Sequence, residues 1–252
     1  MTTFAKTIAA ERPSEIALRD PRQALTWLEV DDQLNRAANA IRSAELGPER
    51  RIAVFAENGV ETAIANLGGL IGGASVVPVN FHLTAEEVAY ILSDSDSRML
   101  FVGPETAERG LAAAQQAGIS AVVGWRCEGA TLVNWDSWLE ESSGTEPDTS
   151  IKPRPNLLYT SGTTGRPKGT HLPPTMFAGG DTVEAHLENL KLNPLATLGP
   201  HLVVGPMYHT GPLSGARLLA AGAPSVILTK FDAENTLKAI AEFKTTSTIM
   251  VP

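Results

Sequence analysis

Cysteine is almost absent from this 252-residue chain, which holds a single one, Cys127. One cysteine excludes an internal disulfide and a zinc site built from cysteines. Its neighbours, Trp125-Arg126 and Glu128, offer no histidine that could activate a thiolate, so we expect a packed, inert thiol. Scarce cysteine is typical of reducing compartments, and we expect a cytoplasmic protein.

Basic residues are in deficit: 20 lysines and arginines stand against 28 aspartates and glutamates, which gives a formal net charge of −8. The chain shows no basic stripe of the kind that binds nucleic acid. The acidic balance also disfavours adhesion to anionic membranes and favours solubility. Nucleic acid is therefore not an expected partner.

Uninterrupted apolar runs of membrane-spanning length are missing as well. The stretch from Thr62 to Phe81 is long and uncharged, but four glycines, Pro78 and Asn80 interrupt it. We interpret it as a helix, a glycine-rich turn and a buried strand, so no membrane span is expected. The five histidines are scattered without ligand spacing, and no metal site formed by protein ligands is predicted.

The chain does have 43% hydrophobic residues, enough for a sizeable core. Apolar runs typical of buried parallel strands alternate with segments of helical periodicity. This alternation predicts an α/β fold with layered, parallel-rich sheets and flanking helices. The expected strands are 16–18, 24–25, 51–56, 76–79, 99–102, 121–123, 157–159, 201–205, 225–228 and 246–251, and the expected helices are about 3–11, 27–46, 58–70, 85–93, 105–117, 173–190, 213–221 and 233–243.

Several of these helices have recognisable starts. Thr26 with Glu29, and Thr84 with Glu87, have the spacing of a capping box, in which hydroxyl and carboxylate satisfy each other's backbone donors. Two consecutive prolines are expected to open the helix at 173–190, because proline is tolerated in a first helical turn.

Residues 141–155 are rich in Ser, Gly, Thr, Pro and charged side chains. This composition indicates a surface linker. We expect it to separate two sublobes of one domain, at approximately 1–140 and 156–252.

The most informative stretch is Tyr159-Thr160-Ser161-Gly162-Thr163-Thr164-Gly165-Arg166-Pro167-Lys168-Gly169. Its glycines let backbone amides turn toward a ligand, and successive amides in such a turn form an anion-binding nest. Its hydroxyls add donors, and its lysine adds a charge suited to phosphate oxygens. The stretch predicts a phosphate-holding loop after a strand, with Thr160, Ser161, Gly162, Thr163, Thr164, Gly165 and Lys168 as the expected binding residues.

Two other interpretations of this stretch were considered. A Walker A loop needs Gly-x-x-x-x-Gly-Lys-Ser/Thr, and here Pro167 precedes the lysine while Gly169 follows it, so that interpretation fails on spacing. A flexible turn between strands would explain the glycines, but not Lys168 or the density of hydroxyls.

The eleven residues resemble the signature loop of the adenylate-forming (AMP-binding) enzymes, which include acyl- and aryl-CoA ligases, nonribosomal-peptide adenylation domains and beetle luciferases. The resemblance implies that the loop holds the β- and γ-phosphates of ATP while a carboxylate attacks the α-phosphate. The family usually has a hydroxyl-histidine pair after this loop, whereas His171 stands earlier and two prolines follow, so no role is assigned to His171.

Pro206-Met207-Tyr208-His209-Thr210-Gly211 resembles a second landmark of the same family, a Pro-x-aromatic-His turn beside the acyl substrate. It implies an acyl pocket that includes Tyr208, His209 and Gly211, since an imidazole can orient a carboxylate. The alternative is a histidine that only fixes the turn through a hydrogen bond.

The resemblance covers essentially all of 1–252, but only the front part of such an enzyme. The later adenine-binding segment, magnesium-binding glutamate, ribose-binding aspartate and mobile lysine are not found before Pro252. We therefore expect a partial N-terminal domain without the C-terminal domain, no catalytic residue within it, and no complete adenylation by it alone. An incomplete sheet leaves an edge and apolar surface exposed, so we also expect a homodimer or poor solubility.

For the parent enzyme the resemblance implies ATP, magnesium arriving with ATP, and coenzyme A, with a small carboxylic acid as substrate. The implied reaction runs from acid to acyl-adenylate to acyl-CoA, releasing pyrophosphate and AMP. The apolar, glycine-rich region 207–222 favours a fatty or related acyl-CoA ligase. The alternatives are an aryl-CoA ligase or other adenylating enzyme, and a short protein that binds nucleotide or acyl ligand without catalysis.

Overall fold

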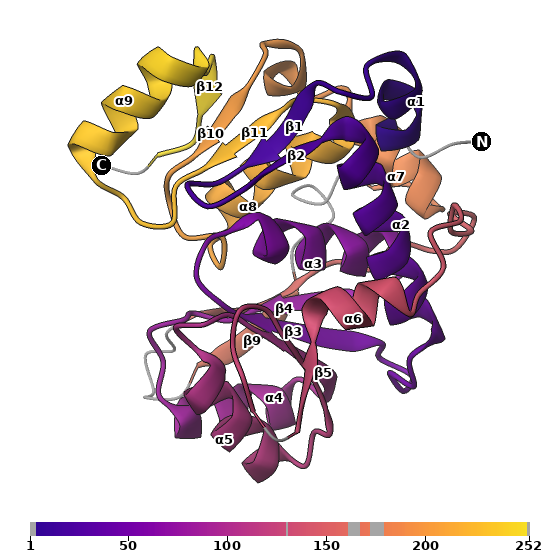
Figure 1. Cartoon of the computed structure of the whole chain (residues 1–252). Helices are drawn as coiled ribbons and strands as arrows, with labels where there is room; N and C mark the ends of the chain where they lie inside the picture. Colours follow the sequence, from indigo (N-terminus) through magenta and orange to yellow (C-terminus); the bar gives the residue numbers. More distant parts are fainter. Residues whose placement is uncertain (1–3, 130, 161–166, 172–178, 251–252) are drawn as a thin grey trace.

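Two five-stranded sheets and a two-stranded hairpin organise the protein (Figure 1). The computed structural model describes residues 4–129, 131–160, 167–171 and 179–250. Its helices are α1 (Phe4–Glu11), α2 (Trp27–Ser43), α3 (Val60–Ile71), α4 (Ala85–Asp94), α5 (Ala107–Ala117), α6 (Trp135–Glu140), α7 (Val183–Leu190), α8 (Thr210–Arg217) and α9 (Ala233–Phe243), with short 3-10 turns at Pro194–Thr197 and Leu218–Ala221.

One sheet, called sheet A here, has the strand order β12 (Ser247–Thr248), β10 (His201–Val203), β11 (Ser225–Ile227), β1 (Ile16–Arg19) and β2 (Ala24–Thr26). Sheet B has the order β4 (Ser75–Pro78), β3 (Arg51–Phe55), β5 (Ser97–Val102), β6 (Ala121–Gly124) and β7 (Leu132–Asn134). Every pair in sheet B is parallel, and in sheet A only β1 and β2 pair antiparallel. The predicted α/β class with parallel-rich sheets is confirmed.

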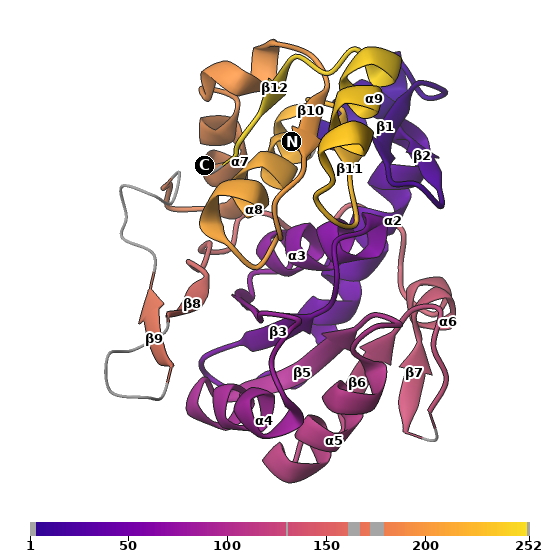
Figure 2. The ribbon, with the colours of Figure 1, turned by 90° about the vertical axis from the view of Figure 1, so that its left-hand side faces the viewer.

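Helices α2 and α3 lie between the two sheets, and α4 and α5 cover the opposite face of sheet B (Figures 1 and 2). In β3, Ile52 and Val54 join the core on the α2–α3 side, whereas Ala53 and Phe55 join the core on the α4–α5 side. Because both faces are covered, the strand is apolar throughout rather than alternating.

The glycine-rich end of α3 is set by close packing against neighbouring elements. A Cβ at Gly68 would lie 2.7 Å from the Cβ of Ala37 in α2, and one at Gly69 would lie 2.6 Å from Ile52 Cδ1 in β3. All twelve residues of α3 are buried. Across the described part of the chain, the helices are too short or too polar to cross a membrane.

Both capping boxes predicted from the sequence are formed. The Thr26 amide donates to Glu29 Oε2 over 2.7 Å, and the Glu29 amide donates to Thr26 Oγ1 over 3.3 Å. Thr84 and Glu87 repeat the arrangement at 2.8 and 3.4 Å. The backbone bonds at these sites lower the pKa of both glutamates.

The helix expected over 173–190 is much shorter in the structure. Residues 172–178 lie outside the described residues, and α7 begins only at Val183, where the Thr182 side chain accepts from the Ala185 amide. Gly179 and Gly180 precede it with φ of 76° and 115°, a left-handed conformation that does not continue a right-handed helix. The prediction of a helix through these glycines was wrong.

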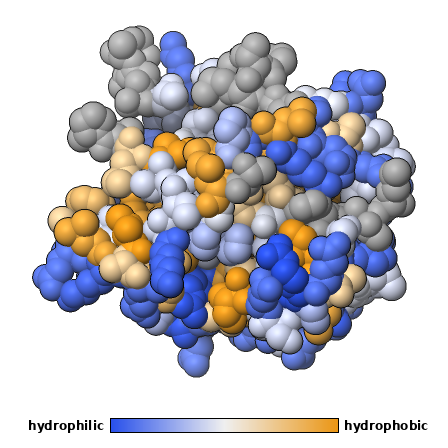
Figure 3. Space-filling view, turned by 90° about the horizontal axis from the view of Figure 1, so that it is seen from above, coloured by the Kyte–Doolittle hydropathy of each residue, from blue (hydrophilic) through white to orange (hydrophobic). Residues whose placement is uncertain are grey.

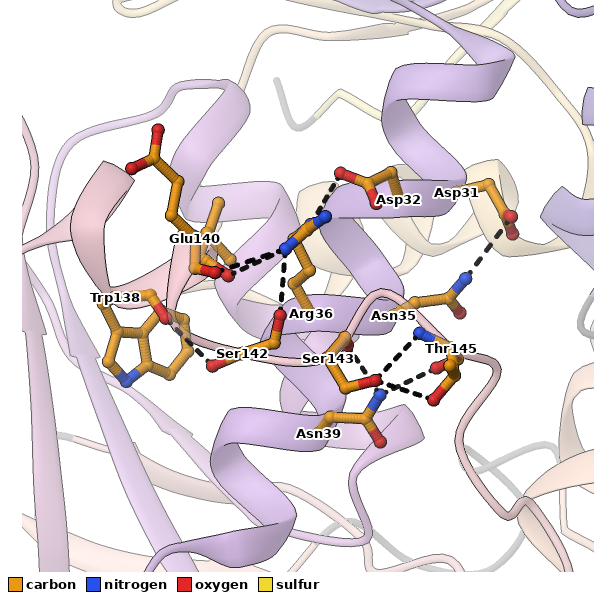
Figure 4. A network of polar contacts seen from close by, with 11 residues as sticks. Asp31, Asp32, Asn35, Arg36, Asn39, Trp138, Glu140, Ser142, Ser143 and Thr145 are labelled. Atoms are coloured by element: carbon orange, nitrogen blue, oxygen red, sulfur yellow. Dashed lines mark hydrogen bonds and ion pairs between the residues drawn. The ribbon is translucent and has the colours of Figure 1, made fainter.

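The segment predicted as a surface linker lies along α2 (Figure 4). Arg36 Nη1 donates to the Ser142 carbonyl over 2.9 Å, and Asn39 Nδ2 donates to the carbonyls of Ser143 and Thr145 over 2.8 and 2.7 Å. Side chains of one helix thus satisfy the backbone of an irregular segment. The predicted boundary between two sublobes, at residues 141–155, stays a proposal. Sheet A combines strands from both sides of this boundary, because β1 and β2 lie in the same sheet as β10 to β12.

Candidate functional site

The predicted phosphate loop lies within a β-hairpin of β8 (Leu157–Thr160) and β9 (Lys168–His171). The two strands pair antiparallel, and the register sets Thr160 opposite Lys168. The Lys168 side chain is exposed at this end of the hairpin. The other expected binding residues, Ser161, Gly162, Thr163, Thr164 and Gly165, lie outside the described residues, so their role stays a prediction.

The strand that enters this loop is anchored through Tyr159. Its hydroxyl donates to Asp94 Oδ2 in α4 over 2.6 Å. Burial and this hydrogen bond to a carboxylate raise the pKa of Tyr159. Gly169, its partner in β9, leaves room for the ring, because a Cβ there would lie 3.2 Å from ring atoms.

The second predicted segment is the turn between β10 and α8. The His209 amide donates to the Pro206 carbonyl over 3.0 Å, and the His209 carbonyl accepts from the Leu213 amide over 3.1 Å. His209 is the N-cap residue of α8, but its side chain makes no capping bond. The backbone therefore closes the turn, and the exposed imidazole remains available for other contacts.

Tyr208 and His209 belong to a row of rings that crosses from sheet A to sheet B. Tyr208 lies 4.4 Å from His209 between ring centroids and meets Phe81 edge-on at 5.7 Å, and Phe81 lies 4.2 Å from His82. Burial raises the pKa of Tyr208. The turn and the loop after β4 together form an aromatic surface beside His209.

Gly211 closes the other side of this turn. A Cβ at Gly211 would lie 3.0 Å from Ile249 Cγ2, just after β12. The absence of a side chain therefore lets the start of α8 approach the end of β12. Membership of Tyr208, His209 and Gly211 in an acyl pocket stays a prediction.

Polar residues that the sequence analysis did not assign follow β3 directly. Burial raises the pKa of Glu57 and of Glu61. Arg126 Nη1 forms an ion pair with Glu61 Oε1 at 3.0 Å. The Val60 amide donates a hydrogen bond to Asp20 Oδ2 over 3.1 Å. The signal for these residues was the polar side chains Glu57, Asn58 and Glu61 directly after an apolar strand, because ligands in parallel sheets gather at the carboxyl ends of strands.

Another unpredicted group is Arg217, at the end of α8. It is 5% exposed, and burial lowers its pKa to about 10. Its Nη2 donates to Oδ1 of the buried Asn156 over 2.7 Å, next to the start of β8. The two candidate segments, β8 and α8, are thus joined by one buried hydrogen bond. Within the described residues, no group of three or more His, Cys, Asp or Glu is arranged to hold a metal ion.

Comparison with known protein families gives a match over nearly the whole chain. The family model of the AMP-binding enzymes matches residues 5–252. The chain belongs to the AMP-binding enzyme family. Both predicted segments, the hairpin and the Tyr208–His209 turn, fall within the range that the family model matches.

Two curated relatives match along nearly the whole chain. One is the indoleacetate–CoA ligase of Aromatoleum aromaticum (strain DSM 19018 / LMG 30748 / EbN1), 27% identical over 97% of this chain and 48% of the relative. The other is the fatty acid–[acyl-carrier-protein] ligase ScoC of Streptomyces coeruleorubidus, 29% identical over 97% of this chain and 46% of the relative. The chain spans about half the length of these relatives.

Among solved structures, the inhibitor-bound N-terminal domain of FACL13 from Mycobacterium tuberculosis has the same fold as this chain. The TM-score is 0.77 at 23% identity, over 100% of this chain and 63% of that chain. At this identity the likeness establishes the fold, and the chemistry must be argued from the residues.

Proposed function

We propose that the chain is the N-terminal, ATP-binding part of an acid–thiol ligase that makes acyl-CoA. The observation that carries this proposal is the hairpin register, which presents Lys168 opposite Thr160 at the two ends of a glycine- and hydroxyl-rich loop. Family membership supports ATP as the nucleotide, because the matched family is that of AMP-binding enzymes.

The proposed reaction has two steps. A carboxylate oxygen of the acid attacks the α-phosphorus of ATP, the bond to the bridging oxygen of pyrophosphate breaks, and an acyl-adenylate forms. The sulfur of coenzyme A then attacks the acyl carbonyl, AMP leaves, and the thiol proton passes to solvent. Such steps depend mainly on positioning and on stabilisation of developing charge.

The proposed roles within this chain concern binding. Lys168 and Thr160, with residues 161–165, hold the departing pyrophosphate. Magnesium enters bound to ATP, since phosphate oxygens commonly supply part of its coordination, and no ligand in this chain is assigned to it. Tyr208, His209 and Gly211 line the entrance for the acid, with the imidazole beside its carboxylate.

The proposed acid is fatty or a related aliphatic carboxylic acid. An aryl acid is the second candidate, because Phe81 and Tyr208 offer an edge-to-face pair that an aromatic substrate could join. One relative acts on indoleacetate and the other on a fatty acid, by their names. We also propose a cytoplasmic location and a homodimer.

ATP binding is tested first by calorimetry on the 252-residue chain, with and without magnesium. We expect Lys168→Ala to weaken ATP binding about tenfold, about 1.4 kcal/mol, through loss of a charge-assisted contact. Lys238→Ala is the matched control, because Lys238 is an exposed lysine of α9 paired with Glu234. Equal ATP affinity in the Lys168 variant and the control would remove this lysine from the site.

Catalysis is tested by acid-dependent exchange of pyrophosphate into ATP, using the protein at its natural length. Decanoate, indole-3-acetate and benzoate serve as probe acids. Exchange that needs one of these acids supports the ligase. ATP binding without exchange for any carboxylic acid would favour the alternative, a nucleotide-binding protein without catalysis.

A further inference from the structure

A single buried side chain connects the carboxyl end of β3 with the turn that carries Tyr208 and His209. Asn58 follows β3 directly and is 2% exposed. Its Oδ1 accepts from the Met207 amide over 2.8 Å. Its Nδ2 donates to the carbonyls of Gly205 over 2.8 Å and of Leu228 over 3.2 Å.

These three partners fix which way round the amide lies. Two carbonyl oxygens require a donor group, and a backbone N–H requires an acceptor, so Nδ2 and Oδ1 cannot be exchanged without losing all three bonds. The partners belong to two places in sheet A: the turn after β10 and the residue after β11. Asn58 therefore ties the ends of two strands of sheet A to the end of a strand of sheet B.

Other contacts hold the turn less completely. The His209 amide closes it on the Pro206 carbonyl, but that bond lies within the turn and does not orient it relative to sheet B. Gly205 packs closely on the first turn of α8, since a Cβ there would lie 2.7 Å from Pro212 Cγ. The edge contact between Phe81 and Tyr208 is a second link between the sheets, but one ring pair constrains the turn less than three hydrogen bonds do.

We propose that Asn58 is a positioning residue for the acid-binding half of the site. It holds Met207 in place, and thereby presents the adjacent Tyr208 and His209 rings to the acid next to Phe81. This inference rests on the proposed function, because the acid is the ligand assigned to the turn. The ATP phosphates are assigned to the separate β8–β9 hairpin, so loss of Asn58 weakens binding of the acid and leaves binding of ATP nearly unchanged.

The first measurement needs no variant. Amide hydrogen exchange of the wild-type 252-residue chain is followed at Met207 and compared with that at His209, whose amide donates only to the Pro206 carbonyl within the exposed turn. We expect Met207 to be among the slowly exchanging amides, because its N–H is bonded to a buried acceptor. Fast exchange at Met207 in a folded chain would overturn the proposal.

The second measurement uses Asn58→Asp, which keeps the size and removes the donors, and Asn58→Ala, which removes all three bonds. Asn66→Ala is the matched control: Asn66 is also 2% exposed and lies in α3, but its Nδ2 donates to Thr62 within the same helix. We expect Asn58→Ala, which loses the acceptor of the Met207 amide, to raise exchange at Met207 at least tenfold, and both Asn58 variants to weaken binding of decanoate or indole-3-acetate at least tenfold. ATP affinity stays within twofold, and the control changes none of these quantities.

The outcomes separate this inference from the function on which it rests. If wild type binds ATP and an acid, and the Asn58 variants bind the acid equally well, the positioning role is wrong while the ligase proposal stands. If ATP and acid affinities fall together, Asn58 acts on stability alone and the proposal is overturned. If wild type binds neither decanoate nor indole-3-acetate, the acid assignment of the turn fails, and exchange at Met207 still decides whether Asn58 holds it.

Discussion

The hydroxyl of Tyr159 lies 2.6 Å from a carboxylate oxygen of Asp94 and donates a hydrogen bond to it. Tyr159 is the residue of β8 that precedes Thr160, and Asp94 is the last residue of α4. The strand that leads into the proposed ATP-binding loop is therefore attached to a helix of sheet B by a side-chain bond as well as by the hairpin.

Replacing Tyr159 with phenylalanine removes only this bond. We expect a loss of about 1 kcal/mol in the free energy of unfolding, the usual net value of a hydrogen bond, measured by urea denaturation. The matched control is Tyr90→Phe, because the Tyr90 hydroxyl lies 3.5 Å from the same carboxylate and bonds it weakly. Equal losses in the two variants would contradict the stronger anchoring by Tyr159.

The same bond predicts a response to alkaline pH. Burial and Asp94 raise the pKa of Tyr159 above its ordinary value of 10.0, so the folded state retains the phenolic proton where the unfolded state releases it. The stability that Tyr159 contributes is complete below pH 10 and is lost as pH rises through the higher folded-state pKa. Tyr159→Phe should show a smaller decline in stability above pH 10 than wild type, measured by thermal unfolding.

His186 predicts a loss of folding stability at acidic rather than alkaline pH. Burial, aided by the charge of Arg217, lowers its pKa from 6.5 to about 4. Below pH 6.5 the imidazole of His186 is protonated in the unfolded chain but stays neutral in the folded chain. The stability that neutral His186 contributes is therefore lost as pH falls from 6.5 toward 4. His186→Gln should flatten the decline in unfolding free energy over this window. An unchanged slope would show that His186 titrates alike in both states.

The contact between α2 and α3 predicts the effect of adding one methyl group. Alanine normally stabilises a helix by about 1 kcal/mol relative to glycine. At Gly68, however, the new Cβ would lie 2.7 Å from Ala37 Cβ, and overpacking of this kind costs about 1–3 kcal/mol. We expect Gly68→Ala to lower the free energy of unfolding, and a stabilised variant in urea denaturation would contradict this close packing.

The capping boxes give a prediction of known sign. Thr84→Ala removes the hydroxyl that accepts from the Glu87 amide, and we expect a loss of about 1 kcal/mol in unfolding free energy. Thr84→Ser is the control, since it retains the accepting oxygen. A loss of equal size in the serine variant would point to the methyl group rather than to the cap.

Self-association is predicted from apolar side chains left on the surface. Phe231, Leu237 and Met250 are 58%, 68% and 51% exposed; Leu237 lies in α9, Phe231 just before it, and Met250 just after β12. Viewed from above, apolar residues are exposed at several places on this face, including the left side, where α9 lies in Figure 1 (Figure 3). We expect light scattering to report a dimer that Leu237→Glu dissociates. A monomeric wild-type chain at high concentration would contradict this prediction.

The sequence predicted those parts of the fold that depend on local patterns. The apolar strands of sheet B and the two capping boxes are signalled by residues that are neighbours along the chain. It did not predict β7 and α6, because Leu132–Asn134 is a short strand whose pairing with β6 depends on tertiary context. It also missed the start of α7, where two glycines in the left-handed region outweigh the helical pattern that follows them.

The residues of the candidate site also differ in whether a local sequence pattern predicts them. Lys168 and His209 are found within recognisable motifs. The position of Asn58 after an apolar strand indicates a polar site, but not its three partners, because these lie far along the chain and become neighbours only when two sheets assemble. Long-range hydrogen bonds of a buried amide cannot be deduced from the amino acids that flank it.

The pairing of β1 with β11 also bears on the order of events during synthesis. Sheet B is made from one continuous part of the chain and can form as soon as that part has left the ribosome. Leu18 is translated well before Ser225, its partner in β11, so sheet A can close only after β11 has been made. β1 can pair early with β2, its neighbour along the chain, but its other edge stays unpaired until β11 has been translated.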